Sequence, residues 1–550
     1  MRLWCWRPAA MALLAALTSP ASSETRALLM GVSHYNTPAI ADLVGPANDV
    51  VAMEALVRDA GASDVVTLRD AEVSRSSVEN AIHSLGARAK KGDWILLYYS
   101  GHGAQARARV ATAQDGSFDQ FLPLAGFDPD HQDPEHFIID KDFYAWLKLY
   151  VPADVRILML VDSCHSGTMH RAVDSRAFGF TARLAFRGQE RAFELVARPG
   201  PQLSSLIPGS NAAGGDRRDD LPNLVYIGAS RDDQLALEVP LPQEGAPSRG
   251  VLTYAFETAL RLAVGDGSRV VADLDGDGRV SVLELSSYLD SQVRMLTAQR
   301  QESSAFFPPS WADFSILSSM PPARAPAPAT PVSVALLFGA GPQPVGSPDA
   351  GWRITSSMAQ ADFLWNATSG EVLRRSGDLV ASGVTTAASL TGVVEKWRAV
   401  QALAPFVSEL NTRLIVAPDG GDVIYREHRK IALDIDRTER GKRAGRLYAT
   451  VFNLASDGTV QMLYPLAPDG DGIVRDEGQT LVLETEVAPP FGTDHVVALT
   501  TPTAPTQLRA VARTLDGTRA ADALLEPIRK TLIQAKGAGS LSISEIYTDR

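Results

Sequence analysis

The chain has 550 residues, which is enough for two or three domains that each bury a hydrophobic core. Its composition, 45% hydrophobic and 21% charged, is ordinary for a globular protein. The formal net charge of -12 argues against a general affinity for nucleic acid, because that affinity requires a basic surface. The charge fits cationic ligands better.

The first 23 residues are predicted to form a secretory signal peptide. Arg2 and Arg7 supply its positive charge, residues 9–17 form a short apolar core, and the small residues 21–23 precede the expected cleavage site. The apolar run is shorter than the ~18 residues that cross a bilayer, and no other segment approaches that length, so no transmembrane segment is expected. We therefore expect an exported protein, either periplasmic or secreted.

Between residues 24 and 318, short apolar segments alternate with amphipathic ones. The segments typical of buried strands are 26–33, 64–70, 93–103, 155–164 and 223–230, and those typical of helices are 45–61, 74–93, 140–150 and 250–265. This alternation predicts an α/β domain with a mostly parallel sheet and helices on both faces. Residues 170–222 lose the periodicity and are rich in Gly, Pro, Ser and Arg, so they are predicted to form a flexible insertion.

The second half of the chain has a different character. Residues 319–334 are rich in Pro and Ala and are predicted to form a linker at a domain boundary. Beyond it, residues 446–466 alternate around the turn sequence SDG like a β-hairpin, and residues 479–501 continue in strands. A smaller β-rich domain of unknown function is therefore predicted for residues 335–550, with one helix near 390–410.

Two of the predicted strands end in residues with reactive side chains. The sequence YYSGHGAQ places His102 between two glycines, and LVDSCHSG places Cys164 after an apolar run. If the two strands are parallel neighbours, both side chains emerge at the same edge of the sheet, where such sheets bind ligands. An imidazole beside a thiol can take its proton or stabilise the thiolate, and Gly103 allows backbone N–H groups to face a developing oxyanion.

Removal of the signal peptide would leave Cys164 as the only cysteine, so no intramolecular disulfide could form. Taken alone, a single cysteine is more often an inert buried residue, and a single histidine more often a structural polar residue. The two together favour catalysis. His102 is preferred over His165, because neighbouring residues at a strand end point apart. A redox thiol enzyme is disfavoured, because no resolving cysteine is present.

The motifs YYSGHGAQ and LVDSCHSG resemble the catalytic motifs of the caspase-like cysteine peptidases, a clan that includes caspases, metacaspases and gingipains. The resemblance is closest to the bacterial metacaspase-like branch. The segments GASRDDQLALE and RGVLTYAFETAL are also similar to the small-subunit region of that family. The resemblance covers residues 25–318. It implies a caspase fold and hydrolysis of peptide bonds by a dyad of Cys164 and His102, with an oxyanion site near Gly103 and Cys164.

The same resemblance implies a substrate pocket for arginine or lysine, at whose positions Asp49, Ser100 and Asp162 stand here. A carboxylate can bind a guanidinium through two charge-assisted hydrogen bonds. Asp162 lies two residues before Cys164, so on a strand both would face the same side. An alternative interpretation of Asp49 is a carboxylate at a helix start, which the helix dipole favours.

The arginines of the 170–222 insertion suggest a further hypothesis, because a peptidase with this specificity could cleave itself there. A solvated insertion whose arginines keep it soluble is an equally simple alternative.

The segment DLDGDGRVSVLE, residues 273–284, matches the twelve-residue EF-hand pattern, with Gly278 at the sharp turn. Its expected ligands are Asp273, Asp275, Asp277, the carbonyl of Arg279, Ser281 and Glu284. Hard oxygen ligands at this spacing suit Ca²⁺, which would regulate the enzyme or brace the domain. An Asp/Gly-rich turn that binds no metal is the alternative. No organic cofactor is expected.

Two hypotheses for the whole protein follow. The first is an exported, calcium-dependent and self-processing cysteine endopeptidase that acts on peptides or proteins containing basic residues. The second is a catalytically silent caspase-like scaffold or binding protein. The presence of both Cys164 and His102 argues against the second. In either case the C-terminal domain is expected to bind a protein partner.

Overall fold

The computed structural model describes most of the chain. The described residues are 23–62, 64–107, 118–163, 181–182, 221–231, 234–241, 246–261, 270–275, 277–297, 299–316, 332–338, 351–358, 361–374, 377–417, 424–466, 473–474 and 481–550. Almost all of the expected signal peptide, most of the 170–222 insertion, most of the 319–334 linker and Cys164 lie outside them.

The first domain is built on a six-stranded sheet in the order β12-β9-β7-β3-β1-β2. Its strands are β1 (Thr25–Gly31), β2 (Asp64–Arg69), β3 (Trp94–Ser100), β7 (Arg156–Asp162), β9 (Leu224–Gly228) and β12 (Ser304–Phe306). All neighbouring pairs are parallel except β12 with β9, at one edge. The central strands are almost wholly buried, as continuous apolar runs require when both faces are covered. The mostly parallel sheet predicted from the sequence is confirmed.

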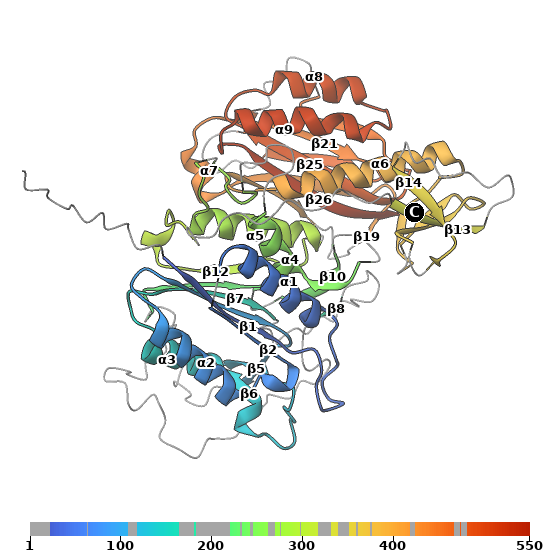
Figure 1. The fold of residues 1–550 in the computed structure, drawn as a ribbon. Coiled ribbons are helices and arrows are strands. Elements are labelled where there is room, and N and C mark those ends of the chain that lie inside the picture. The colour runs from blue at the N-terminus through green and yellow to red at the C-terminus, as the bar shows by residue number, and fades with distance from the viewer. Residues whose placement is uncertain are drawn as a thin grey trace, which may run out of the picture.

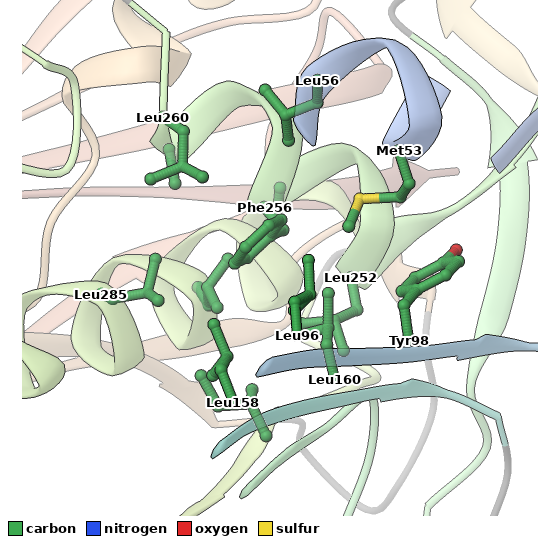
Figure 2. Packing of buried hydrophobic residues seen from close by; sticks show 14 of the residues in the cluster. Met53, Leu56, Leu96, Tyr98, Leu158, Leu160, Leu252, Phe256, Leu260 and Leu285 are labelled. Atoms are coloured by element: carbon green, nitrogen blue, oxygen red, sulfur yellow. The ribbon is translucent and has the colours of Figure 1, made fainter. Parts of the chain in front are cut away.

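Helices cover both faces of this sheet (Figure 1). One face packs against α2 (Arg75–Arg88) and α3 (Asp140–Tyr150), and the other against α1 (Gly45–Asp59), α4 (Val251–Ala259) and α5 (Val282–Leu296). The side chains of β3 alternate between the two hydrophobic cores, as the two-residue period of a strand requires. Figure 2 shows Leu96 and Tyr98 of β3 beside Leu158 and Leu160 of β7, on the face that packs against α1 and α4.

Two small sheets were not predicted. One contains β4 (Ala104–Arg107), β5 (Phe118–Pro123) and β6 (Phe137–Ile139), and the other β8 (Thr181–Ala182), β10 (Leu237–Pro240) and β11 (Ser248–Gly250). Strand β8 comes from the segment that was expected to be a flexible insertion. Two residues of that segment therefore pair with β10 in an antiparallel sheet. Helix α4 ends at Ala259, earlier than its apolar pattern suggested.

The C-terminal domain contains an eleven-stranded sheet and a three-stranded sheet packed on it. The large sheet contains β13 (Val332–Phe338), β14 (Trp352–Thr355), β15 (Phe363–Asn366), β16 (Glu371–Leu373), β17 (Leu379–Ala381), β19 (Ile424–Arg426), β21 (Leu447–Leu454), β22 (Val460–Tyr464), β23 (Ile473–Val474), β25 (Gly492–Thr501) and β26 (Ser540–Asp549). The small sheet contains β18 (Thr412–Ala417), β20 (Lys430–Arg437) and β24 (Leu481–Glu486). The β-rich second domain is confirmed, and β21 and β22 form the predicted antiparallel hairpin.

The helices of this domain are α6 (Ala387–Leu403), α7 (Glu439–Arg443), α8 (Thr506–Leu515) and α9 (Leu525–Gln534). Helices α6, α8 and α9 pack on the face of the large sheet opposite the small sheet. Strand β13 begins at Val332, so the last three residues of the expected 319–334 linker form part of a strand. Val332 is buried and pairs with Trp352, which explains why the apolar sequence after the prolines joins the sheet. None of the helices in the described part of the chain combines the length and apolar character needed to cross a bilayer.

A buried polar cluster lies where α6 meets the large sheet. Lys396 is fully buried, its ammonium donates to the carbonyl of Thr493 at 2.6 Å, and burial lowers its pKa to about 8. The neighbouring Asp494 accepts hydrogen bonds from the Asn453 amide at 2.9 Å and from the backbone N–H of Ser456 at 2.7 Å. Desolvation raises the pKa of Asp494 to about 6. Burial therefore disfavours the charged forms of Lys396 and Asp494, which lowers the stability of the fold at this position.

Helix α5 lies between the two domains and contacts both (Figure 1). Its Val293 belongs to the core of the first domain, and its Met295 to a core made otherwise by the second. Arg294 forms a buried ion pair with Glu409, and the amide of Gln292 donates to the carbonyl of Ala404 at 2.7 Å. The two domains therefore share a packed interface.

Candidate active site

The edge of the sheet that carries the two motifs is set by strand register. Strands β3 and β7 are parallel neighbours, and Ser100 at the end of β3 pairs with Asp162 at the end of β7. His102 and Cys164 each follow two residues after this pair. The parallel neighbours required by the sequence argument are therefore present, while Cys164 itself lies outside the described residues.

His102 is held at three points. Its backbone N–H donates to the hydroxyl of Tyr35 at 3.0 Å, and its carbonyl accepts from the hydroxyl of Tyr99 at 3.0 Å. Its ring atom Nε2 lies 2.8 Å from the carbonyl oxygen of Ala41. The ring is buried and packs at a tilt against Tyr35, with centroids 5.0 Å apart. None of these three contacts was predicted, because Tyr35 and Ala41 lie more than 60 positions from His102 and the contact with Tyr99 depends on how the chain turns after β3.

The contact with Ala41 determines which ring nitrogen of His102 carries hydrogen. A carbonyl oxygen can only accept, so Nε2 must be the donor. In the neutral imidazole the lone pair is then on Nδ1. Nδ1 is therefore the atom that can exchange a proton with a nucleophile or a leaving group.

The glycines beside His102 have distinct roles. A Cβ at Gly101 would lie 2.5 Å from the Tyr99 hydroxyl, so any side chain there would displace the group that holds His102. Gly103 is buried between His102 and strand β4. The assignment of Gly103 to an oxyanion site stays a prediction.

The three predicted pocket residues come from three elements and are fully buried. Asp49 lies on α1, and the hydroxyl of Ser100 donates to its carboxylate at 2.9 Å. Asp162 lies opposite Ser100 and accepts from the N–H and hydroxyl of Thr253 at 2.9 and 2.6 Å. The Thr253 hydroxyl also lies 2.7 Å from that of Tyr98. The structure thus brings Asp49, Ser100 and Asp162 to one end of the sheet.

Both carboxylates lie at the N-terminus of α4. Asp49 accepts from the N–H of Gly250, the residue that caps this helix, at 3.1 Å, and Asp162 accepts from the N–H of Thr253 in its first turn. The positive end of the helix dipole stabilises such anions. The alternative interpretation, in which Asp49 is a carboxylate at a helix start, therefore has a structural basis. The helix concerned is α4, whereas Asp49 itself belongs to α1.

Arg249 is the main residue at this end of the sheet that the sequence argument missed. Its Nε donates to Asp49 at 2.9 Å, and its Nη2 donates to Glu257 at 3.0 Å. The residue lies on β11, directly before α4. Its position in the segment RGVLTYAFETAL was visible, but nothing in that segment indicated a contact with a residue 200 positions earlier.

The predicted calcium loop brings its aspartates together. Carboxylate oxygens of Asp273, Asp275 and Asp277 lie within 4.8 Å of one another. Glu284 accepts from the N–H groups of Asp275 at 3.0 Å and Ser281 at 2.9 Å. Burial raises the pKa of the Glu284 carboxyl. An all-oxygen donor set that converges in this way fits a hard cation such as Ca²⁺.

The remaining predicted ligands also lie in the loop. The Ser281 hydroxyl caps α5 by accepting from the N–H of Glu284 at 3.1 Å, so it serves the helix start. The N–H of Arg279 donates to Asp277 at 2.8 Å, and Gly278 has φ of 86°, as the sharp turn requires. The role of the Arg279 carbonyl as a ligand stays a prediction.

Comparison with known proteins shows what the N-terminal region is similar to. Residues 25–172 match the family model described as metacaspase, peptidase C14 domain. The chain is 31% identical over 158 residues to Metacaspase-1 of Mycosarcoma maydis, covering 27% of this chain and 37% of that protein. It is 26% identical over 272 residues to Metacaspase-1 of Pyricularia oryzae, covering 44% and 65%. It is 30% identical over 164 residues to Metacaspase-2 of Trypanosoma brucei brucei, covering 28% and 45%. The chain thus spans less than two thirds of each of these relatives.

Two solved structures align more distantly. A protein from Geobacter sulfurreducens aligns with a TM-score of 0.35 and 20% identity over 54% of this chain and 98% of its own. Caspase-1 from Spodoptera frugiperda aligns with a TM-score of 0.31 and 8% identity over 52% and 87%. The sequence matches support the similarity to metacaspase-type peptidases that the two motifs indicated.

Proposed function

We propose that this chain, whose N-terminal region is a caspase-like peptidase domain of the metacaspase type, is a cysteine endopeptidase that cleaves after arginine or lysine. The observation that carries the proposal is the pairing of Ser100 with Asp162 on neighbouring parallel strands. This register supports a common edge for His102 and Cys164, each two residues further along its own segment.

The proposed reaction uses a thiol, an imidazole and N–H groups of this chain, with water as the second reactant. The Cys164 thiol gives its proton to Nδ1 of His102, and the resulting thiolate attacks the carbonyl carbon of the scissile amide while N–H groups near Gly103 and Cys164 stabilise the oxyanion. His102 delivers a proton from Nδ1 to the leaving amine, and the C–N bond breaks. Water then hydrolyses the thioester and restores the thiol. The contact of Nε2 with Ala41 supports this assignment, because it keeps the ring orientation fixed.

The preference for basic residues is supported by the acidic groups at the strand ends. Asp49 and Asp162 are buried beside Ser100, and each can bind a cationic side chain more strongly there than in water. Peptides or proteins with exposed arginine or lysine are the proposed substrates. Self-processing within residues 170–222 remains part of the proposal and would appear as new N-termini that are absent in Cys164→Ala.

We further propose that Ca²⁺ binds the loop at residues 273–284. Asp273, Asp275 and Asp277 would supply carboxylate oxygens, and the ion would brace the start of α5. No organic cofactor is part of the proposal. Export to the periplasm or the medium and recognition of a protein partner by the C-terminal domain are also proposed, the first on the basis of residues 1–23.

Hydrolysis of short reporter peptides tests the function. Peptides that differ only in Arg, Lys or Gln before the scissile bond are given to the wild type and to Cys164→Ala, with Ca²⁺ or with a chelator. Turnover of the Arg and Lys peptides that disappears in Cys164→Ala supports the endopeptidase. Absence of Cys164-dependent turnover on every peptide would favour the catalytically silent scaffold.

A further inference from the structure

The carboxylate expected to bind a substrate cation already binds one from its own chain. Asp49 accepts from Arg249 Nε at 2.9 Å and from the Ser100 hydroxyl at 2.9 Å, and both of its oxygens accept from the N–H of Gly250 at 3.1 Å. It is 0% exposed. A carboxylate has room for about four hydrogen bonds, so a substrate guanidinium cannot simply be added to this set.

We infer that Arg249 is a specificity-determining residue: its guanidinium occupies Asp49 in the resting protein, and a basic side chain of the substrate must displace it. This inference rests on the proposed preference for arginine and lysine. It assigns to Arg249 the role of an internal competitor, which raises the KM for basic substrates and leaves the chemistry of Cys164 and His102 untouched.

The surroundings of Arg249 allow the exchange. The Arg249 side chain is 12% exposed, while Asp49 is fully buried, so the arginine is the partner of this pair that water can reach. It comes from β11, a strand of only three residues at the edge of a small sheet. Its outer end pairs with Glu257, which is 12% exposed and helps to keep the guanidinium against Asp49 in the resting protein.

The exchange leaves Asp49 with most of its donors. Ser100 is fixed at the end of β3 and Gly250 at the start of α4, so both continue to donate when Arg249 moves away. The incoming side chain replaces only the charge-assisted bond from Nε. Because that bond must be broken first, its strength is subtracted from the affinity for every basic substrate.

Arg249→Gln is the direct test, with the reporter peptides that carry Arg, Lys or Gln before the scissile bond. A charge-assisted hydrogen bond contributes enough to change affinity by about tenfold or more. We expect KM for the Arg and Lys peptides to fall by about tenfold with kcat unchanged, and the Gln peptide to be unaffected. Guanidinium ion, added at millimolar concentration, should raise KM for the Arg peptide in the variant and not in the wild type. An unchanged or higher KM for the basic peptides in Arg249→Gln would overturn the inference.

Two further variants keep the test valid if Arg249→Gln folds poorly. Glu257→Gln loosens the outer end of Arg249 without removing charge from Asp49, and it should lower KM for basic peptides by a few-fold. Arg231→Gln is the matched control, because that arginine is mostly exposed and pairs with Glu302. It should change no parameter. Basic-peptide KM values that stay at the wild-type level in Glu257→Gln, or that fall equally in Arg231→Gln, would also overturn the inference.

Failure of the proposed function gives a different result. If the wild type cleaves no peptide, binding of Nα-acetyl-arginine amide is measured by calorimetry in Cys164→Ala with and without Arg249→Gln. Tighter binding in the double variant supports the internal competitor, and equal or weaker binding contradicts it. Turnover by the wild type that Arg249→Gln and Glu257→Gln leave unchanged would refute the role of Arg249 alone.

Discussion

Adjacent tyrosines on β3 allow the positioning of His102 to be tested separately from the pocket. Tyr98 and Tyr99 are both fully buried, and successive side chains of a strand face opposite sides. The Tyr99 hydroxyl donates to the carbonyl of His102 at 3.0 Å, whereas that of Tyr98 lies 2.7 Å from Thr253, which donates to Asp162. Each tyrosine therefore serves one half of the proposed site.

In Tyr99→Phe, the buried carbonyl of His102 loses its hydroxyl donor. A buried polar group deprived of a hydrogen bond costs about 1–3 kcal/mol, so the free energy of unfolding should fall by about this amount. If at least half of the lower value, about 0.5 kcal/mol, raises the barrier of the catalytic step, kcat should fall by about twofold, and by more than tenfold if most of the upper value does. KM for the Arg peptide should change little, because Asp49 and Asp162 are untouched.

Tyr98→Phe is the matched control, since it removes a hydroxyl from the same strand at the same depth. Its unfolding free energy should fall by a similar amount, but the effect on turnover should appear in KM for basic peptides and not in kcat. Urea unfolding and the kinetics of the Arg and Gln peptides are measured for both variants. Equal losses of kcat in the two variants, or an unchanged kcat in Tyr99→Phe, would refute the positioning role of Tyr99.

Three other predictions concern the rest of the chain. Glu409→Gln should destabilise the protein by about 3–5 kcal/mol, because it leaves the Arg294 charge buried, and calorimetry should then resolve separate transitions for the domains; a single unshifted transition would contradict this. Added Ca²⁺ should raise the melting temperature of the wild type but not of Asp275→Asn, and an equal rise in both would exclude this loop as the site. The pKa of Asp494, raised from 3.8 to about 6, makes the stability of the wild type relative to Asp494→Asn greatest below pH 4. The free energy of unfolding of the wild type, measured relative to Asp494→Asn, should fall by up to about 3 kcal/mol as pH rises to 7. Urea unfolding that gives the same difference between the two proteins at every pH would contradict the raised pKa.

The sheet of the first domain could be predicted because its strands are long apolar runs that end in recognisable motifs. The alternation of these runs with amphipathic helices indicated parallel pairing, and β3 and β7 are indeed neighbours. The short strands could not be predicted in the same way. Strands such as β8 and β11 have two or three residues, too few to show a two-residue period.

The candidate site was predictable only where a residue type carries its own chemistry. His102, Asp49 and Asp162 belong to motifs, and the structure places all three at one end of the sheet. The contacts that hold them could not be predicted, because they join distant segments. Tyr35 is 67 positions from His102, and Arg249 is 200 positions from Asp49. Such pairings depend on the completed fold, and no local pattern records them.

The position of α5 also limits how the chain can be divided. A protein shortened at the prolines after residue 318 would retain the whole helix, yet Met295 would face water and the Arg294 guanidinium would have no carboxylate from the missing half. Such a fragment would be prone to aggregate through this newly uncovered stripe. The proline-rich segment connects the two domains in sequence. Their shared interface, however, is formed by α5, the helix that follows the predicted calcium loop.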